Sequence, residues 1–122
     1  IRGHNLLAAL ETRLDNMVYR LGFASSRKAA RQLVRHRHIE VNGRTVDIPS
    51  FVVLPGQEIR VRTGSRENGF IQSALEHASR GASPSWLAVD RSTFSGRMLE
   101  RPSRPNIPIA AQEQLVVELY SK

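Results

Sequence analysis

The chain has 122 residues and no cysteine, and it is 40% hydrophobic and 24% charged, as expected for one ordinary globular domain. No apolar run approaches the ~20 residues of a transmembrane helix, and no basic-then-apolar leader opens the chain. The sequence therefore excludes an integral membrane protein and gives no sign of secretion. The net charge is +7, and every basic residue except Lys28 and Lys122 is arginine. Because the planar guanidinium suits phosphate, this balance favours a nucleic-acid partner.

The positive charge is concentrated in the first half of the chain. Residues 1–62 contain 11 basic and 5 acidic groups, whereas residues 63–122 contain 7 and 6. We therefore expect the first half of the chain to bind the nucleic-acid partner.

Apolar residues at helical spacing predict one unbroken helix from Asn5, its cap, to Leu21, with Gly22 as the stop. On that helix Arg13, Asn16 and Arg20 share one border of the apolar arc. Glu11 and Asp15 fall on the other side.

A second helix is predicted from the Ser25 or Ser26 cap to about residue 35 or 36. Arg27, Arg31 and Arg35 repeat at every fourth position and form one stripe, with Lys28 beside them. A charged stripe is often only a solvated helix face. Between positions 20 and 44, however, seven basic groups accompany one acid, so we expect the chain itself to leave the stripe unneutralised.

The remaining pattern alternates between strands and helices. It predicts a hairpin that turns at Asn42-Gly43, with Ile39 and Val41 before the turn and Val46 and Ile48 on the return. It also predicts a strand at 59–61, a helix at 70–80, and strands near 86–89 and 94–99. Three prolines make 101–108 irregular, and 112–120 suits either a helix or a strand.

Other chemistry finds little support in the sequence. His36 and His38, with His4 and His77, make a weak metal pattern without cysteine or acids, so we expect no metal site. No nucleophile or phosphate-loop motif is present, and we expect no catalytic residue and no cofactor. The two helices are compatible with a helix-turn-helix DNA binder, but the following hairpin and the arginine-rich stripe favour folded RNA. With Tyr19 and Phe23 as the nearby rings, base stacking is a minor expectation.

Two groups of segments point to a known family. In the first half they are Arg13–Phe23, Ser26-Arg27, Ala30–Val34, Ile39–Gly43 and Ile48–Ser50. In the second half they are Pro84–Leu87 and Glu113–Lys122. Together they closely resemble the family of bacterial ribosomal small-subunit protein four. The resemblance covers nearly the whole chain and is weakest between positions 91 and 111.

The resemblance implies an α+β fold. Two helices and a small antiparallel sheet would form an RNA-binding module, flanked by an N-terminal helix and a C-terminal tail that pack together. It divides the chain into 1–12, a remnant of an N-terminal helical region, 13–80, the module with a linker and helix, and 81–122, a family-specific region. Family members carry a longer N-terminal segment, which binds zinc in some of them. We expect that segment, and any zinc site in it, to be missing here.

The resemblance also implies a function without catalysis. Such a protein is a cytoplasmic constituent of the small ribosomal subunit that binds its ribosomal RNA at a helix junction of the 5′ domain, early in assembly. It contacts ribosomal small-subunit protein five, lies near the messenger RNA entry path and supports translational accuracy, with no membrane association. The RNA-facing positions implied here are Arg13, Asn16, Arg20, Ser26, Arg27, Lys28, Arg31, Gln32, Arg35, His36, His38 and Arg44.

The first half alone leaves another class of protein open. It is similar to modules appended to pseudouridine synthases, a heat-shock protein and tyrosyl-tRNA synthetase. The alternative is therefore an RNA-modifying enzyme that grips RNA with this module and carries its catalytic domain elsewhere.

Overall fold

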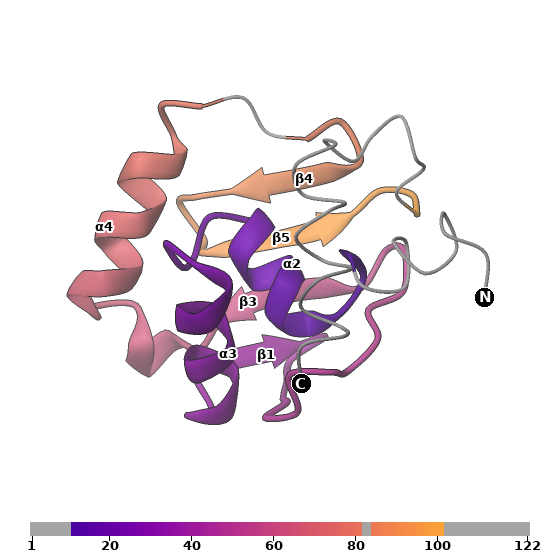
Figure 1. Ribbon diagram of the computed structural model, residues 1–122, viewed down its shortest axis with the longest axis horizontal. Coiled ribbons are helices and arrows are strands. Elements are labelled where there is room, and N and C mark those ends of the chain that lie inside the picture. Colours follow the sequence, from indigo (N-terminus) through magenta and orange to yellow (C-terminus); the bar gives the residue numbers. More distant parts are fainter. Residues whose placement is uncertain (1–10, 82–83, 102–122) are drawn as a thin grey trace.

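The computed structural model describes residues 11–81 and 84–101, and it shows helices packed against one antiparallel sheet (Figure 1). The sheet has five strands in the order β2-β1-β3-β5-β4. Its strands are β1 (Ile39–Val41), β2 (Arg44–Thr45), β3 (Glu58–Val61), β4 (Leu87–Asp90) and β5 (Ser95–Met98). The predicted α+β class is confirmed. The predictions for positions before 11 and after 101, including the packing of the two ends, lie outside the described residues.

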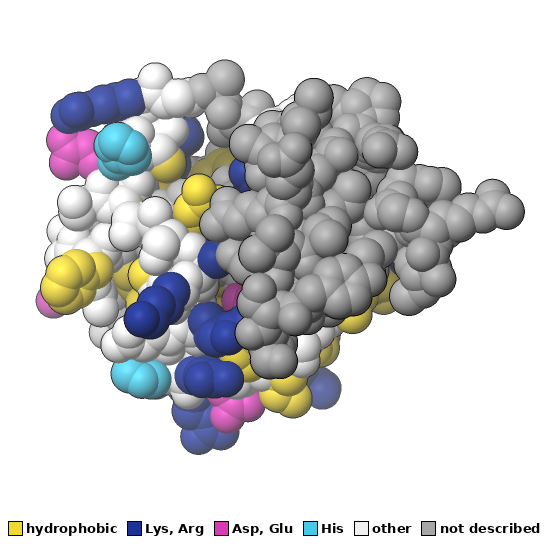
Figure 2. All heavy atoms as spheres, in the orientation of Figure 1, with side chains coloured by type: hydrophobic (Ala, Val, Ile, Leu, Met, Phe, Trp, Pro, Cys, Tyr) yellow, Lys and Arg dark blue, Asp and Glu magenta, His cyan; other side chains and the backbone are white. Residues whose placement is uncertain are grey.

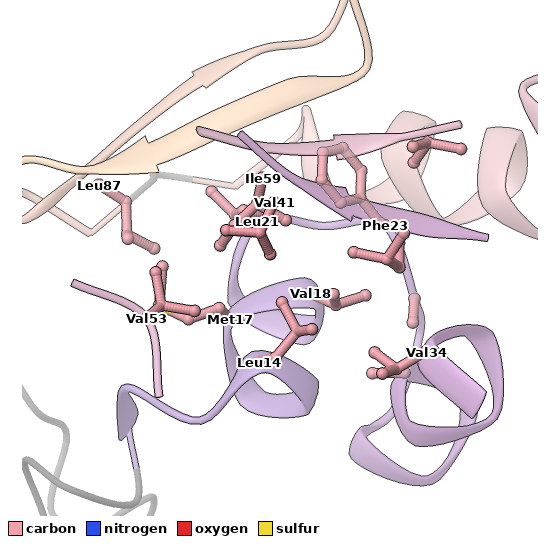
Figure 3. Packing of buried hydrophobic residues seen from close by; sticks show 14 of the residues in the cluster. Leu14, Met17, Val18, Leu21, Phe23, Val34, Val41, Val53, Ile59 and Leu87 are labelled. Atoms are coloured by element: carbon pink, nitrogen blue, oxygen red, sulfur yellow. The ribbon is translucent and has the colours of Figure 1, made fainter. Parts of the chain in front are cut away.

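Helices α2 (Leu14–Arg20) and α3 (Arg27–Arg35) lie together over one face of this sheet (Figure 1). Inward-facing residues of the strands, such as Ile59, meet Leu14, Leu21 and Val34 from the helices in one apolar core (Figure 3). All four of these side chains are at most 1% exposed. Burial of this kind stabilises the fold by ~1.5–3 kcal/mol for each large side chain, and it fixes which face of each helix points outward.

The prediction of one unbroken helix through residue 13 is wrong. Arg13 has extended backbone angles (φ −63°, ψ 144°), and α2 begins only at Leu14. Instead of continuing a helix, this stretch pairs with the segment after the hairpin: Leu14 N–H donates to Phe51 O at 2.8 Å and Val53 N–H to Thr12 O at 2.9 Å. The break changes the direction in which Glu11 points, which is decisive for the site below.

The hairpin forms where it is predicted, but its return strand is shorter than expected. Asn42 and Gly43 have φ angles of 50° and 81°, as a two-residue turn of type I′ requires. That tight turn brings Arg44 directly opposite Val41. Strand β2 is Arg44–Thr45, so Val46 and Ile48 lie beyond its end.

Later elements follow the predicted pattern closely. A short 3₁₀ turn, Thr63–Ser65, precedes α4 (Gly69–Ala78), whose first turn is capped by the Asn68 side chain. Strands β4 and β5 form a hairpin, and β5 pairs with β3, which joins the last strands to the sheet that α2 and α3 cover. Within the described part of the chain, no helix is long and apolar enough to cross a membrane.

Two glycines permit the close contact between α2 and its surroundings. Gly22 ends α2 with φ +92°, and a Cβ there would lie 2.6 Å from the Cβ of Ala78 in α4. A Cβ at Gly96 in β5 would lie 2.5 Å from Cδ2 of Leu21. The backbone of β5 therefore sits directly under the end of α2, and a side chain at either glycine would force the elements apart.

Candidate nucleic-acid interface

Two buried acids organise the basic side chains of α2. Glu11 is 1% exposed, and its carboxylate accepts two hydrogen bonds from the Arg20 guanidinium, both at 3.1 Å. Asp15 is 6% exposed and accepts two from Arg13, both at 3.2 Å. Paired, charge-assisted bonds of this kind fix the plane of a guanidinium as well as its position.

The same two acids reach across to α3. Arg27 Nη2 lies 4.0 Å from Glu11 Oε1, and Arg31 Nε lies 3.6 Å from Asp15 Oδ2. We call Arg13, Arg20, Arg27 and Arg31 the arginine cluster. The cluster holds four positive charges against two negative ones and keeps a net positive charge.

Asn16 and Tyr19 fix Arg27 further. The Asn16 amide donates to the Glu11 carbonyl at 2.9 Å and accepts from Arg27 Nε at 2.9 Å. The Arg27 guanidinium also lies over the Tyr19 ring, 4.8 Å from its centroid, where a cation is attracted to the π face. Arg27 Nη2 is buried without a hydrogen-bond partner. Asn16 is itself only 2% exposed, so the structure places it behind the arginine cluster as a positioning residue.

The expectation of an unneutralised stripe on α3 is therefore wrong for Arg27 and Arg31. The helix is interrupted at Arg13, and this interruption turns Glu11 and Asp15 toward the arginines. An unbroken helix would keep these acids and arginines apart. The arginines are positioned by the protein and not merely exposed.

Of the other predicted RNA-facing positions, most are exposed and one caps a helix. Lys28, Gln32 and Arg35 are exposed along the outer side of α3, His36 is exposed directly after the helix, and Arg44 is exposed on β2. Ser26 caps α3, its Oγ accepting from Ala29 N–H at 3.0 Å. We call the arginine cluster together with Lys28 and Arg35 the basic face. Figure 2 shows basic side chains gathered below the centre of the view, where α3 lies in Figure 1.

His38 lies partly buried at the start of β1. Its Nδ1 is 2.7 Å from Oγ of Ser65, a buried residue. Burial, followed by the nearby charges of Arg62 and His36, lowers the pKa of His38 below its usual value of 6.5. His38 is therefore mostly neutral at pH 7 in the folded chain.

This lowered pKa predicts a loss of stability in acid. The unfolded chain takes up the His38 proton at a higher pH than the folded chain, so the free energy of unfolding falls as the pH drops below 6.5. The decline ends below the folded-state pKa. Urea unfolding followed between pH 5 and 8 is expected to show this decline, and His38→Gln is expected to reduce it. An equal decline in the variant would contradict the assignment.

The described residues do not form a cluster of metal ligands. Across residues 11–81 and 84–101 no group of three or more His, Asp or Glu side chains is arranged to hold a metal ion.

Sequence reasoning overlooked the acids that organise the site. It placed Glu11 and Asp15 on the opposite border of a helix from Arg13 and Arg20. The sequence signal was weak: two acids lie within nine residues of two arginines, but only their burial in the structure requires them to pair. Detecting it required knowledge of the break at Arg13, which depends on pairing with residues 51–53.

Comparison with known proteins agrees with this architecture. Residues 12–59, which include α2, α3 and the first hairpin, match the S4 domain family. This part of the chain is thus similar to an S4 domain. Over its entire length the chain is 56% identical to small ribosomal subunit protein uS4 of Thermoanaerobacter sp. (strain X514) and 54% identical to that of Syntrophus aciditrophicus (strain SB). Over 98% of its length it is 52% identical to uS4 of Anaeromyxobacter sp. (strain Fw109-5).

The chain is therefore similar to these uS4 proteins over nearly its whole length, in agreement with its sequence motifs. It spans 58% of the length of each of these three relatives.

Proposed function

We propose that the chain binds ribosomal RNA of the small subunit and acts there as a structural protein. The observation that carries the proposal is the arginine cluster: four guanidinium groups oriented by two buried carboxylates, next to the exposed Lys28 and Arg35. Relatives along the whole chain are named as small ribosomal subunit proteins, which supports this function over that of an RNA-modifying enzyme.

The mechanism that we propose is electrostatic and geometric. Each arginine that meets a phosphate displaces condensed counterions from the RNA, which supplies affinity, while the fixed guanidinium planes set the position of the phosphates. Because Glu11 and Asp15 already restrain the cluster, less side-chain entropy is lost on binding. Guanidinium groups held in fixed positions suit phosphates that converge from several RNA helices better than they suit the regular phosphates of a uniform duplex.

The finer proposals come from the family. We propose a junction in the 5′ domain of the RNA as the target, binding early in subunit assembly, and a location in the cytoplasmic small subunit. There the protein would contact ribosomal small-subunit protein five, lie near the messenger entry path and support accuracy. In this proposal the module of 13–80 contacts RNA, with 1–12 and 81–122 as flanking regions.

Competition binding tests the proposal. With labelled 5′-domain RNA at fixed salt, unlabelled 5′-domain RNA is expected to displace the label at a concentration at least tenfold lower than duplex DNA of equal phosphate content. Chemical footprinting of the same complex is expected to protect a helix junction. Equal competition by DNA would favour a general polyanion binder and contradict the proposal.

A further inference from the structure

A groove runs beside the basic face, between α3 and α4. It has a volume of about 760 Å³, within the ~300–1,000 Å³ typical of small-ligand sites. Its floor includes Phe23, Ala24 and Ala74, which are buried. Figure 1 shows α3 and α4 on either side of this region.

The walls of the groove carry groups that suit a flat, polar ring. Gln32 of α3 and His36, the residue after α3, line one side, and His77 and Phe70 line the other from α4. Phe70 is 88% exposed, so its ring is accessible for stacking. An amide that both donates and accepts, in the same groove as an aromatic ring, is a combination that proteins use to recognise an unpaired nucleobase.

The groove is continuous with the basic face. At 100° per residue around α3, the outward positions run from Arg31 and Arg35 through Lys28 to Gln32 and then to Ala29 in the groove. Cations that suit phosphates therefore lie directly beside the groove. An RNA strand whose phosphates contact Arg35 and Lys28 would bring its bases to Gln32.

We propose that this groove binds an unpaired nucleotide of the same RNA that the basic face contacts. The base would stack on Phe70 and form hydrogen bonds with Gln32, while its phosphate would meet Lys28. The inference rests on the proposed RNA-binding function and adds a preference for RNA with a base outside the helical stack. The charge beside the groove favours a nucleotide over an apolar protein segment.

Two hairpin RNAs test the inference, one with a single bulged 2-aminopurine and one fully paired. The wild-type chain is expected to bind the bulged RNA about fivefold more tightly and to quench its fluorescence by stacking. Phe70→Ala is expected to abolish both the preference and the quenching. Because Phe70 is so exposed, this change leaves the core intact, and Phe70→Trp is expected to retain both effects.

Leu99→Ala serves as the control, since Leu99 is an exposed apolar residue at the end of β5 and does not line the groove. It is expected to behave as wild type. Equal binding of both RNAs by the wild type, or an unchanged preference in Phe70→Ala, would overturn the inference and leave the proposed function standing. If equal binding of both RNAs is accompanied by a Phe70-dependent self-association of the chain, the groove is instead a site of protein contact. Failure of the wild type to bind the 5′-domain RNA would instead overturn the proposed function.

Discussion

Changing Arg31 and Arg35 together to Gln is expected to weaken binding of the 5′-domain RNA about 30-fold at 0.1 M salt. Each phosphate contact contributes ~0.7–0.9 to the slope of log affinity against log salt concentration, so the slope is expected to fall by about 1.4 to 1.8. The Arg31 side chain is 38% exposed and Arg35 lies on the exposed side of α3, so neither change opens the core. Filter binding from 0.05 to 0.4 M salt measures both quantities.

The matched control for this variant is Arg80 and Arg97 changed to Gln. It removes the same charge from two exposed arginines, one just after α4 and one on β5, and neither belongs to the basic face. A much smaller loss of affinity is expected. If the two double variants bind equally, net charge explains the affinity and the basic face has no special role.

Changing Glu11 to Gln and Asp15 to Asn is expected to weaken binding of the 5′-domain RNA about tenfold, although it adds two units of positive charge. Each acid orients two arginines, and losing that orientation costs about 0.5–1.5 kcal/mol for each side chain that must then be fixed on binding. The two added positive charges offset part of this cost. Heparin has no fixed junction geometry, so its binding is expected to stay equal or tighten. Weaker binding of the 5′-domain RNA without weaker binding of heparin distinguishes an effect of arginine geometry from an effect of net charge.

Glu76 and Glu100 changed to Gln provide the control for this variant, because both are exposed acids outside the arginine cluster. Their loss raises the net charge equally and is expected to strengthen binding of both polyanions slightly. Thermal unfolding of all variants shows whether the fold is retained, and each single change at Glu11 or Asp15 gives a milder test. Tighter binding of the 5′-domain RNA by a folded acid variant would refute the role of the two acids.

Local signals were sufficient to predict most of the fold. The Ser26 cap, the Gly22 stop, the Asn42-Gly43 turn and the alternation in β3 each depend on residues close together in sequence, and each was confirmed. The start of α2 was not predictable in this way. Helical periodicity continues through Arg13, and the backbone pairing with residues 51–53 that breaks it comes from the other side of the hairpin.

The candidate site was predicted in composition but not in arrangement. Arg27, Arg31 and Arg35 fall on one side of α3 because helical geometry requires it. Their environment depends on how α2 packs against α3, which a helical wheel drawn for one element does not contain. The burial of Asn16 and the pairing of Arg31 with Asp15 both follow from that tertiary contact.

The close approach of Leu21 to Gly96 has a consequence for the order of events during synthesis. The end of α2 leaves the peptidyl-transferase machinery long before β5 is made, so Leu21 cannot reach its final neighbour until most of the chain has emerged. Contacts so distant in sequence slow folding, because a large loop must close before they form.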